Sequence, residues 1–404
     1  MTAAVSVASE PDLGRMQRDR WAKLRAAMDR QGVDALLLLG NSNVSYATGA
    51  SWPLGDPGRA NVERPVAVVT ADGDPPHLFT PFPELTAEAM ALPADHVHGP
   101  VYLEFDEGAQ AFARTLAGLV PASGRLAVDE LPGSVRRAEP LLFPGSAPTG
   151  AEDVIGAAKL LKGPDELGFL RRALQITEEA IAPVQDALAP GVRQVDLTAV
   201  FLGAAFDLGA EANILDPIFQ VMPPRLADGP WTTHGGIACP LVTTERQLAA
   251  GDVLWVDTGL SYAGFSSDFG RTWTVGTPPT DRQQEQFRAW RRILDAVLAV
   301  TRAGVTGADL TRAALGASDG PRPWMEHFYL GHGLGIDSAE APFIGTDLGD
   351  AYDERQVLAA GTVLVLEPLV WDDGAYGYRA EEVIVVTDDG YLSLTDYPYD
   401  PYGD

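Results

Sequence analysis

Two aspartates flank a turn in this sequence and could hold a metal ion between them. Asp257 ends the apolar run 253–256, and Asp268 follows after a turn that contains Gly264. A hairpin of this kind would bring the two carboxylates to neighbouring strand positions. Adjacent buried carboxylates repel one another and each loses hydration, and a cation between them offsets both effects. The alternative is a surface hairpin with two turn-capping aspartates, because Asp is common in turns.

Three more candidate ligands lie further along the chain. His332 stands between two glycines, Glu367 ends the apolar run 364–366, and Glu381 stands just before the apolar run 383–386. Taken alone, each has a structural explanation, as a turn residue or as an exposed strand end. Together with the two aspartates they supply four carboxylates and one imidazole, and the resulting charge matches two divalent ions. Oxygen-dominated ligation with one imidazole suits manganese first, then iron or cobalt, with zinc also possible.

The composition of the chain disfavours several other functions. Its 404 residues are 46% hydrophobic and 21% charged, which is ordinary for a globular protein of roughly two or three domains. The 56 acidic and 29 basic residues give a net charge of −27, which disfavours binding to nucleic acid or to an anionic membrane. The single cysteine, Cys239, cannot form an internal disulfide, and we see no signal-peptide pattern or run of membrane-spanning length. We therefore expect a cytoplasmic protein.

The first part of the chain mixes helix and strand patterns. Asp12 can cap a helix that ends near Gly32, and short strands are expected at 35–39, 64–70, 78–80 and 125–129. This mixture predicts a small α/β domain that ends near residue 155.

The remainder of the chain contains the elements that must position the candidate ligands. Pro164 suits the first turn of a helix that extends to about Leu188. Thr280 and Gln283 form a capping box at the start of another helix. Strands are expected at 362–366, 381–386 and 391–394, so the C-terminal third is rich in β-structure. Since most candidate ligands lie at the ends of apolar strands, the strands are predicted to bring them together.

The order of these motifs resembles metallopeptidase family M24. The matching motifs are VDTG at 256–259, SDFGRT at 267–272, GHGLGID at 331–337, LEPLVW at 366–371 and YRAEE at 378–382. The segment 35–49 resembles the creatinase-type N-terminal domain, and the motif KGPDEL at 162–167 resembles the start of the catalytic domain. The resemblance implies an α/β N-terminal domain at residues 1–155 and an α+β pita-bread catalytic domain at residues 156–404.

The resemblance also implies a role for each candidate ligand. Asp257 would bind one metal ion through both carboxylate oxygens, while Asp268 and Glu381 would bridge two ions. His332 and Glu367 would complete the ligands of the second ion, and both would take part in catalysis. In the family, a metal-bridging hydroxide is the nucleophile, and the residue that corresponds to Glu367 moves its proton.

Two arginines beside the ligands receive separate roles by the same resemblance. Arg379 would lie beside the site and could hold a substrate carboxylate, whereas Arg271 would brace the metal-binding hairpin.

The chain departs from the pattern of the proline-specific family members, which carry three further histidines around the metals. Alignment by spacing places Pro240, Phe328 and Ala339 at these positions. His327 and His234 lie near two of the positions, out of register, and are candidates to contact the substrate in place of the missing histidines. Phe328, Tyr329 and Ala339 would make the substrate site more apolar.

Three functions follow as hypotheses. The first is a dinuclear metal-dependent hydrolase that cleaves an amide C–N bond of a short peptide, similar to an Xaa-Pro peptidase. The second is a small-molecule enzyme on the same fold, either a creatinase-like C–N hydrolase or a metal-dependent lyase that resembles dimethylsulfoniopropionate lyases and uses a base such as Asp337. The third is a non-catalytic binding module. The resemblance further implies a homodimer.

Overall fold

The chain is described here by a computed structural model that covers residues 5–50, 64–73, 75–83, 92–121, 123–145, 147–223, 225, 245–319, 322–399 and 402. These residues fall into two units. One unit is Glu10–Lys159, and the other begins at Leu160 and includes residues 5–9. The backbone N–H of Ala8 donates to the carbonyl of Pro164, which ties the start of the chain to the second unit. The predicted boundary at residue 155 lies inside helix α7 (Glu152–Lys159), at the end of the first unit.

The first helix of the N-terminal unit begins and ends where its sequence predicts. In α1 (Leu13–Gln31), the Asp12 side chain accepts a hydrogen bond from the backbone N–H of Arg15, and Gly32 ends the helix with a φ of 60°. This left-handed conformation is available to glycine because it has no Cβ. The apolar side of the helix buries Trp21 and Leu24.

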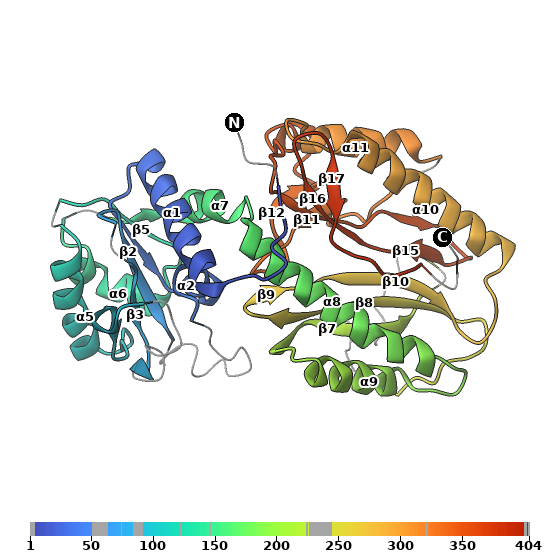
Figure 1. The fold of residues 1–404 in the computed structure, drawn as a ribbon, viewed down its shortest axis with the longest axis horizontal. Helices are drawn as coiled ribbons and strands as arrows, with labels where there is room; N and C mark the ends of the chain where they lie inside the picture. The colour runs from blue at the N-terminus through green and yellow to red at the C-terminus, as the bar shows by residue number, and fades with distance from the viewer. Residues whose placement is uncertain are drawn as a thin grey trace. The chain divides into compact units, whose positions relative to one another are not determined.

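A six-stranded mixed sheet forms the centre of the N-terminal unit (Figure 1). Its strand order is β4-β3-β2-β1-β5-β6, and β1 pairs parallel to β5 and antiparallel to β2. The strands are β1 (Ala35–Leu38), β2 (Val66–Thr70), β3 (His77–Phe79), β4 (Val97–His98), β5 (Leu126–Val128) and β6 (Thr149–Gly150). The flanking helices include α2 (Asn41–Thr48), α5 (Asp106–Leu119), α6 (Gly133–Leu142) and the short 3₁₀ helix η1 (Ala94–His96). Phe112 of α5 and Val135 of α6 pack into one core with the sheet.

The first half of the C-terminal unit is a sheet covered by two helices. The helices α8 (Pro164–Ala187) and α9 (Gln194–Asp207) pack against strands β7 (Ala212–Val221), β8 (Val253–Tyr262) and β10 (Phe269–Thr274), and the two-residue strand β9 (Phe265–Ser266) pairs with β8. Pro164 occupies the first turn of α8, as predicted. Phe201 of α9 and Val256 and Trp273 of the sheet lie in the shared core.

The second half repeats the plan of a sheet under two helices. The helices are α10 (Asp281–Val300) and α11 (Gly307–Ala317), followed by the single turn α12 (Asp350–Asp353). The sheet has the order β12-β11-β13-β16-β17, with β11 (Gly331–Gly333), β12 (Glu340–Ile344), β13 (Val363–Leu366), β16 (Glu382–Val386) and β17 (Tyr391–Ser393). A separate hairpin joins β14 (Leu369–Trp371) to β15 (Gly377–Arg379). The predicted capping box of Thr280 and Gln283 starts α10.

In the C-terminal unit, each of the two sheets carries its own helix pair, as Figure 1 shows. This arrangement matches the predicted pita-bread architecture, and the strand ends that carry the candidate ligands meet between the two halves.

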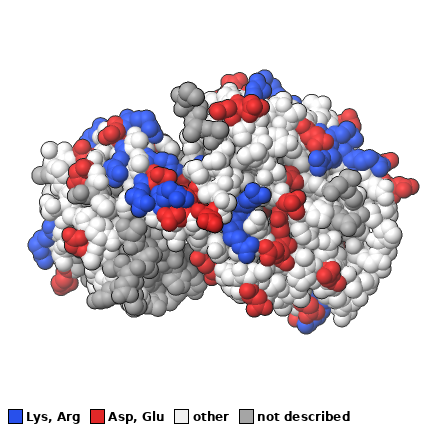
Figure 2. All heavy atoms as spheres, in the orientation of Figure 1, with Lys and Arg blue, Asp and Glu red and all other residues white. Residues whose placement is uncertain are grey.

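Charged side chains of both signs are interspersed on the face drawn in Figure 2. The described part of the chain contains no helix with the length and apolar character needed to cross a lipid bilayer.

Candidate metal centre

The pairing of β8 with β10 brings the two predicted aspartates together. Gly270 lies opposite Asp257 in the antiparallel register, and Asp268 stands just before the first residue of β10. Both aspartates are buried, at 8% and 5% exposure respectively. The hairpin therefore holds two carboxylates in the protein interior instead of exposing them as turn caps.

A glycine in this hairpin makes room for a third carboxylate. A Cβ added to Gly270 would lie 2.7 Å from Cδ of Glu381 and 2.8 Å from Nη1 of Arg379. Any side chain here would displace both groups, so the lack of a Cβ permits their close approach. The backbone N–H of Glu381 also donates to the carbonyl of Gly270 at 3.1 Å. These contacts fix the carboxylate of Glu381 against the hairpin.

The three carboxylates converge on one point. Asp257, Asp268 and Glu381 each place one oxygen so that the three oxygens lie within 4.8 Å of one another. Oxygen Oε2 of Glu381 is buried and accepts no hydrogen bond from the described residues. Buried polar atoms almost always have a partner, so this oxygen marks a place that suits a bound cation.

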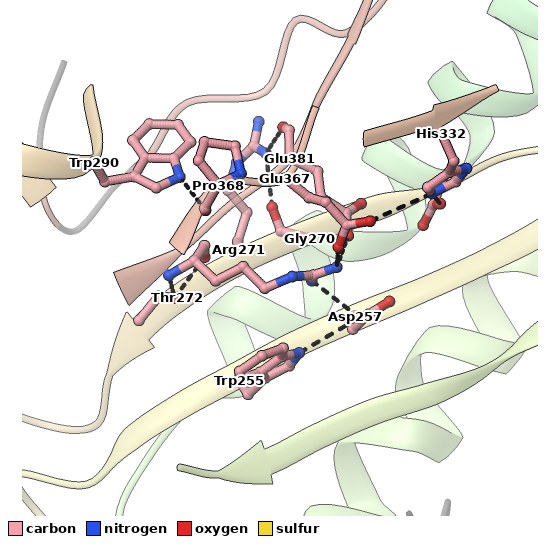
Figure 3. Close-up of polar contacts among 12 residues, drawn as sticks. Trp255, Asp257, Gly270, Arg271, Thr272, Trp290, His332, Glu367, Pro368 and Glu381 are labelled. Carbon is pink, nitrogen blue, oxygen red and sulfur yellow. Dashed lines mark hydrogen bonds and ion pairs between the residues drawn. The ribbon is translucent and has the colours of Figure 1, made fainter. Parts of the chain in front are cut away.

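His332 presents a ring nitrogen to the carboxylates (Figure 3). Its Nδ1 lies 2.9 Å from the carbonyl oxygen of Gly333. A carbonyl can only accept, so we assign the proton to Nδ1, which leaves the lone pair of the neutral ring on Nε2. That nitrogen lies 3.3 Å from Oδ2 of Asp268 and 3.6 Å from Oε1 of Glu367. A backbone acceptor that orients a histidine in this way is typical of metal ligands.

Glu367 lies just beyond the end of β13 and faces the same point. Its backbone N–H donates to the carbonyl of Leu330, at 3.0 Å, next to β11. The side chain is 4% exposed, and Figure 3 shows its carboxylate beside the imidazole of His332. Strand pairing between β13 and β11 thus sets the distance between these two candidate ligands.

Arg379, at the end of β15, lies among the carboxylates. Its Nη1 is 3.0 Å from Oδ2 of Asp257, its Nη2 is 2.5 Å from Oε2 of Glu367, and Nη2 also pairs with Glu381. Its guanidinium carbon lies 5.0 Å from the centre of the Trp255 ring. Burial opposes the positive charge, but the neighbouring carboxylates outweigh it and hold the pKa of Arg379 well above its usual value.

The carboxylates themselves resist ionisation in the absence of a cation. Burial raises the pKa of Asp268 well above its usual value, and repulsion from Asp257 and Glu367 raises it further. Burial likewise raises the pKa of Glu381 and Glu367, although Arg379 acts in the opposite direction on both. Four ionised carboxylates against one arginine leave an excess of three negative charges. A divalent cation offsets most of this repulsion, so the donors fit a metal centre rich in oxygen ligands.

Arg271 connects the hairpin to the C-terminal segment. Its Nη1 donates to the carbonyls of Gly270 and Glu381, at 2.8 Å each, while Nη2 donates to Tyr397 and Nε to Pro398. The side chain is 1% exposed. All four acceptors are backbone carbonyls, so this arginine supports the position of Glu381 as a brace.

One of the predicted substrate contacts, His327, does not join the cluster in the described structure. The side chain of His327 is 86% exposed, and its Nδ1 lies 2.6 Å from Oδ2 of Asp347. It therefore extends toward solvent, because its position is set by Asp347 and not by the metal ligands. His234, together with Pro240 and Cys239, lies outside the described residues.

Aromatic side chains cover His332 on one side. The ring of Tyr329 meets the imidazole edge-on, with 5.0 Å between ring centres, and Phe328 lies 4.7 Å from Tyr329. Burial raises the pKa of the Tyr329 phenol, and the charges of Glu367 and Asp268 raise it further. Ala339, which stands just before β12, is half-buried.

Two positions at the centre escaped the sequence interpretation. The hydroxyl of Thr272 donates to the carbonyl of Arg379 and accepts from its N–H at 3.0 Å, which locks β10 to β15. Gly270 was likewise assigned no role of its own. A small residue between two candidate ligands was the available signal for Gly270, whereas the contacts of Thr272 depend on the distant strand β15.

Together, the fold and the site define a two-domain protein whose C-terminal unit carries a buried cluster of carboxylates that could hold a divalent metal ion. Residues 168–388 match the model of metallopeptidase family M24, and residues 20–155 match the Creatinase/Prolidase N-terminal domain. The chain therefore belongs to metallopeptidase family M24, whose members use divalent metals. The predicted family and the predicted two-domain fold are confirmed.

Relatives of known name fall into more than one class. The probable dipeptidase PepE of Mycobacterium tuberculosis is 30% identical over 263 residues, which is 63% of this chain and 64% of that protein, just under two thirds of its length. The Xaa-Pro dipeptidase of Pyrococcus furiosus is 25% identical to this chain. The alignment covers 94% of this chain and 98% of the dipeptidase. The dimethylsulfoniopropionate lyase DddP of Roseovarius nubinhibens is 28% identical to this chain. The alignment covers 97% of this chain and 88% of the lyase.

Solved structures agree on the fold. The prolidase from Pyrococcus horikoshii OT3 superposes with a TM-score of 0.74 at 23% identity, covering 95% of this chain and 99% of that one.

Proposed function

We propose that the chain is a dinuclear metal-dependent hydrolase that cleaves an amide C–N bond, with short Xaa-Pro peptides as its first candidate substrates. The observation that carries the proposal is the convergence of four buried carboxylates and the Nε2 of His332 on one buried cluster. A non-catalytic binding module is the weaker alternative, because a decayed site has no physical need to keep repelling carboxylates in its interior. In this proposal residues 156–404 form the catalytic domain.

The donor set suggests how two ions would be divided. We assign Asp257 to one ion, His332 and Glu367 to the other, and Asp268 and Glu381 to both. Manganese is the first choice, because oxygen ligands dominate and a single imidazole completes the set. Two bound ions would supply Lewis-acid activation of a water molecule and of the substrate carbonyl.

Glu367 is the residue placed to move a proton. It is 4% exposed, burial raises its pKa, and its two oxygens face the His332 ring and the Arg379 guanidinium. A carboxylate of raised pKa can take the proton of the attacking water and return it to the leaving nitrogen. Arg379 keeps this carboxylate oriented through its Nη2, and it lowers the negative charge of the cluster.

Tyr329 is proposed to contact the substrate. Its ring packs on His332, and its raised pKa keeps the phenol protonated, so it can donate a hydrogen bond toward the cluster. The proline-specific members have histidines near this position, where this chain has aromatic residues. Phe328 and Ala339 would shape an apolar wall beside it.

Turnover of a peptide panel by metal-loaded protein tests the proposal. Protein loaded with Mn²⁺ should release proline from some Xaa-Pro dipeptides or tripeptides, and EDTA should abolish the release. Asp268→Ala should remove both bound metal and turnover, whereas the exposed Asp388→Ala should retain both. Protein that holds its metal and still cleaves no peptide in the panel would contradict the peptidase assignment.

A lyase is the second candidate, and a specific observation favours it. The lyase DddP of Roseovarius nubinhibens aligns over 97% of this chain, and Phe328 and Ala339 replace histidines expected of a proline-specific site. In a lyase, a base such as Asp337 would remove a proton from the carbon beside the substrate carboxylate. The electron pair would form a C=C bond, and the sulfide would leave with the electrons of the C–S bond.

A direct comparison separates the two candidates. Metal-loaded protein is incubated with dimethylsulfoniopropionate and, separately, with the peptide panel. Release of dimethyl sulfide that Asp337→Asn abolishes would favour the lyase, while proline release that survives Asp337→Asn would favour the peptidase.

Two further properties belong to the same proposal. We propose a homodimer, which light scattering of the purified protein measures, and a cytoplasmic location, which fractionation of the source cell measures.

A further inference from the structure

A cluster of histidines lies in the N-terminal unit, away from the residues of the metal centre in sequence. Three of the six histidines in the chain, His77, His96 and His98, come from β3, η1 and β4. Strand β4 is at the edge of the six-stranded sheet, and the three side chains are half-buried. Small solutes can therefore reach the cluster from solvent.

Two ring nitrogens of this cluster already converge. Nδ1 of His77 lies 3.0 Å from Nε2 of His98. A hydrogen bond between two imidazole nitrogens contains one proton, so one of the two nitrogens presents a lone pair to the other. If the donor ring changes tautomer, so that its other nitrogen carries the proton and the ring stays neutral, two lone pairs face the same point. This is the chemical state in which imidazoles bind a metal ion.

The rings are held in place by stacking. His96 lies parallel to His77, with 4.1 Å between ring centres, and Phe79 lies 4.7 Å from His98. Nδ1 of His96 is 2.8 Å from the carbonyl oxygen of Pro75. Since that carbonyl can only accept, Nδ1 of His96 carries the proton and its Nε2 carries a lone pair. The cluster thus offers imidazole nitrogens on a supported framework.

The separation of the two nitrogens selects a coordination geometry. With metal–nitrogen bonds of about 2.05 Å, a 3.0 Å separation gives a nitrogen–metal–nitrogen angle of about 94°. That angle suits neighbouring positions of a square-planar or octahedral ion and is smaller than a tetrahedral angle. Imidazole ligands in a tetragonal arrangement favour Cu²⁺ and Ni²⁺.

We propose that His77 and His98, stacked and supported by His96, bind one Cu²⁺ or Ni²⁺ ion at the edge of the N-terminal sheet. The site differs in chemistry from the carboxylate centre, since imidazole nitrogen replaces carboxylate oxygen. Water would complete the coordination, because the described residues supply two converging nitrogens. The ion would join β3 to β4 through their side chains. The proposal is independent of the reaction that the chain catalyses.

Copper titration of a chain whose carboxylate centre lacks the Asp268 carboxylate tests the site. The full-length Asp268→Asn variant, treated with EDTA and dialysed, is titrated with Cu²⁺ and followed by calorimetry and electron paramagnetic resonance. We expect one ion per chain with hyperfine coupling to nitrogen. His98→Gln in the same background should weaken binding at least tenfold and remove coupling to one nitrogen.

Two further variants keep the test decisive. His77→Gln should reproduce the effect of His98→Gln, which guards against local misfolding of a single variant, and circular dichroism checks both folds. His327→Gln removes an exposed histidine of the other unit and should change nothing. Unchanged affinity in both cluster variants, a spectrum without nitrogen coupling, or loss of the ion in His327→Gln would each overturn the proposal.

Discussion

Replacing Asp268 by asparagine should stabilise the metal-free protein while abolishing its metal binding. The substitution keeps the size of the side chain and removes one buried negative charge. Without a cation, burial and repulsion from Asp257 and Glu367 disfavour the ionised form of Asp268, and its pKa is therefore raised. With cations, the same charge binds them. The two effects of one substitution therefore have opposite signs.

The size of the gain follows from the geometry of the cluster. The ligand oxygens of Asp257, Asp268 and Glu381 lie within 4.8 Å of one another. At that separation an ionised pair repels by about 3.5 kcal/mol for an effective dielectric constant of about 20. Asp268 takes part in two of the three pairs, and Arg379 offsets part of the repulsion. The folded wild-type protein can also reduce the repulsion by binding protons. We therefore expect Asp268→Asn to raise the free energy of unfolding of the metal-free protein by about 2–4 kcal/mol at pH 8.

The stability of the metal-free protein should fall as the pH rises. A carboxyl whose pKa is raised by folding stabilises the protein fully below its unfolded pKa, and this stabilisation is lost as the pH rises through the folded value. Burial raises the pKa of Asp268, Glu367 and Glu381. In EDTA, the wild-type protein should lose up to about 1.4 kcal/mol per pH unit for each proton retained only by the folded state. Asp268→Asn should flatten this slope.

Urea unfolding at pH 5.5 and pH 8, with EDTA or with Mn²⁺, measures these effects. Mn²⁺ should stabilise the wild-type protein and leave Asp268→Asn unchanged, because binding to the folded state raises stability by mass action. The exposed Asp388→Asn is the matched control and should follow the wild type. Lower stability of Asp268→Asn in EDTA at pH 8, or wild-type metal content in that variant, would refute the reasoning.

Three further substitutions probe the surroundings of the centre. Gly270→Ala places a Cβ 2.7 Å from Cδ of Glu381 and should lower metal affinity at least tenfold in calorimetry; unchanged affinity would contradict the tight approach. Arg271→Lys leaves at least one of the four backbone carbonyls without a donor and should destabilise the protein by about 1–3 kcal/mol in urea, and a loss under about 1 kcal/mol would exclude the bracing role. Tyr329→Phe keeps the ring on His332 and should lower kcat/KM about 10–100-fold at unchanged metal content, since a hydrogen bond to a charged group contributes about 1.5–3 kcal/mol; equal kcat/KM would remove the phenol from the mechanism.

Local sequence determined the parts of the fold that depend on contacts within a few residues. The Asp12 cap and Gly32 stop of α1, and the capping box of Thr280 and Gln283 in α10, are formed as predicted. The Pro164 start of α8 is also formed. These signals lie within one helical turn, so they require no knowledge of the tertiary fold.

The sequence also predicted the residues that cluster at the candidate metal centre, for a different reason. A carboxylate at the end of an apolar strand, such as Glu367 after β13, is drawn into the interior by its neighbours. Its burial is expected only if a cation or a partner compensates its charge. The recurrence of this pattern, together with its order along the chain, predicted the family.

Only the tertiary structure decided which groups surround the donors. Arg379, expected beside the site as a substrate contact, lies among Asp257, Glu367 and Glu381 because Thr272 locks β15 to β10. The histidine cluster at His77 depends on the pairing of β3 with β4. Strand pairing joins residues far apart in sequence, and their separation carries no signal of the contact. His327, adjacent in sequence to the apolar wall, extends to solvent because Asp347, twenty residues later, holds it there.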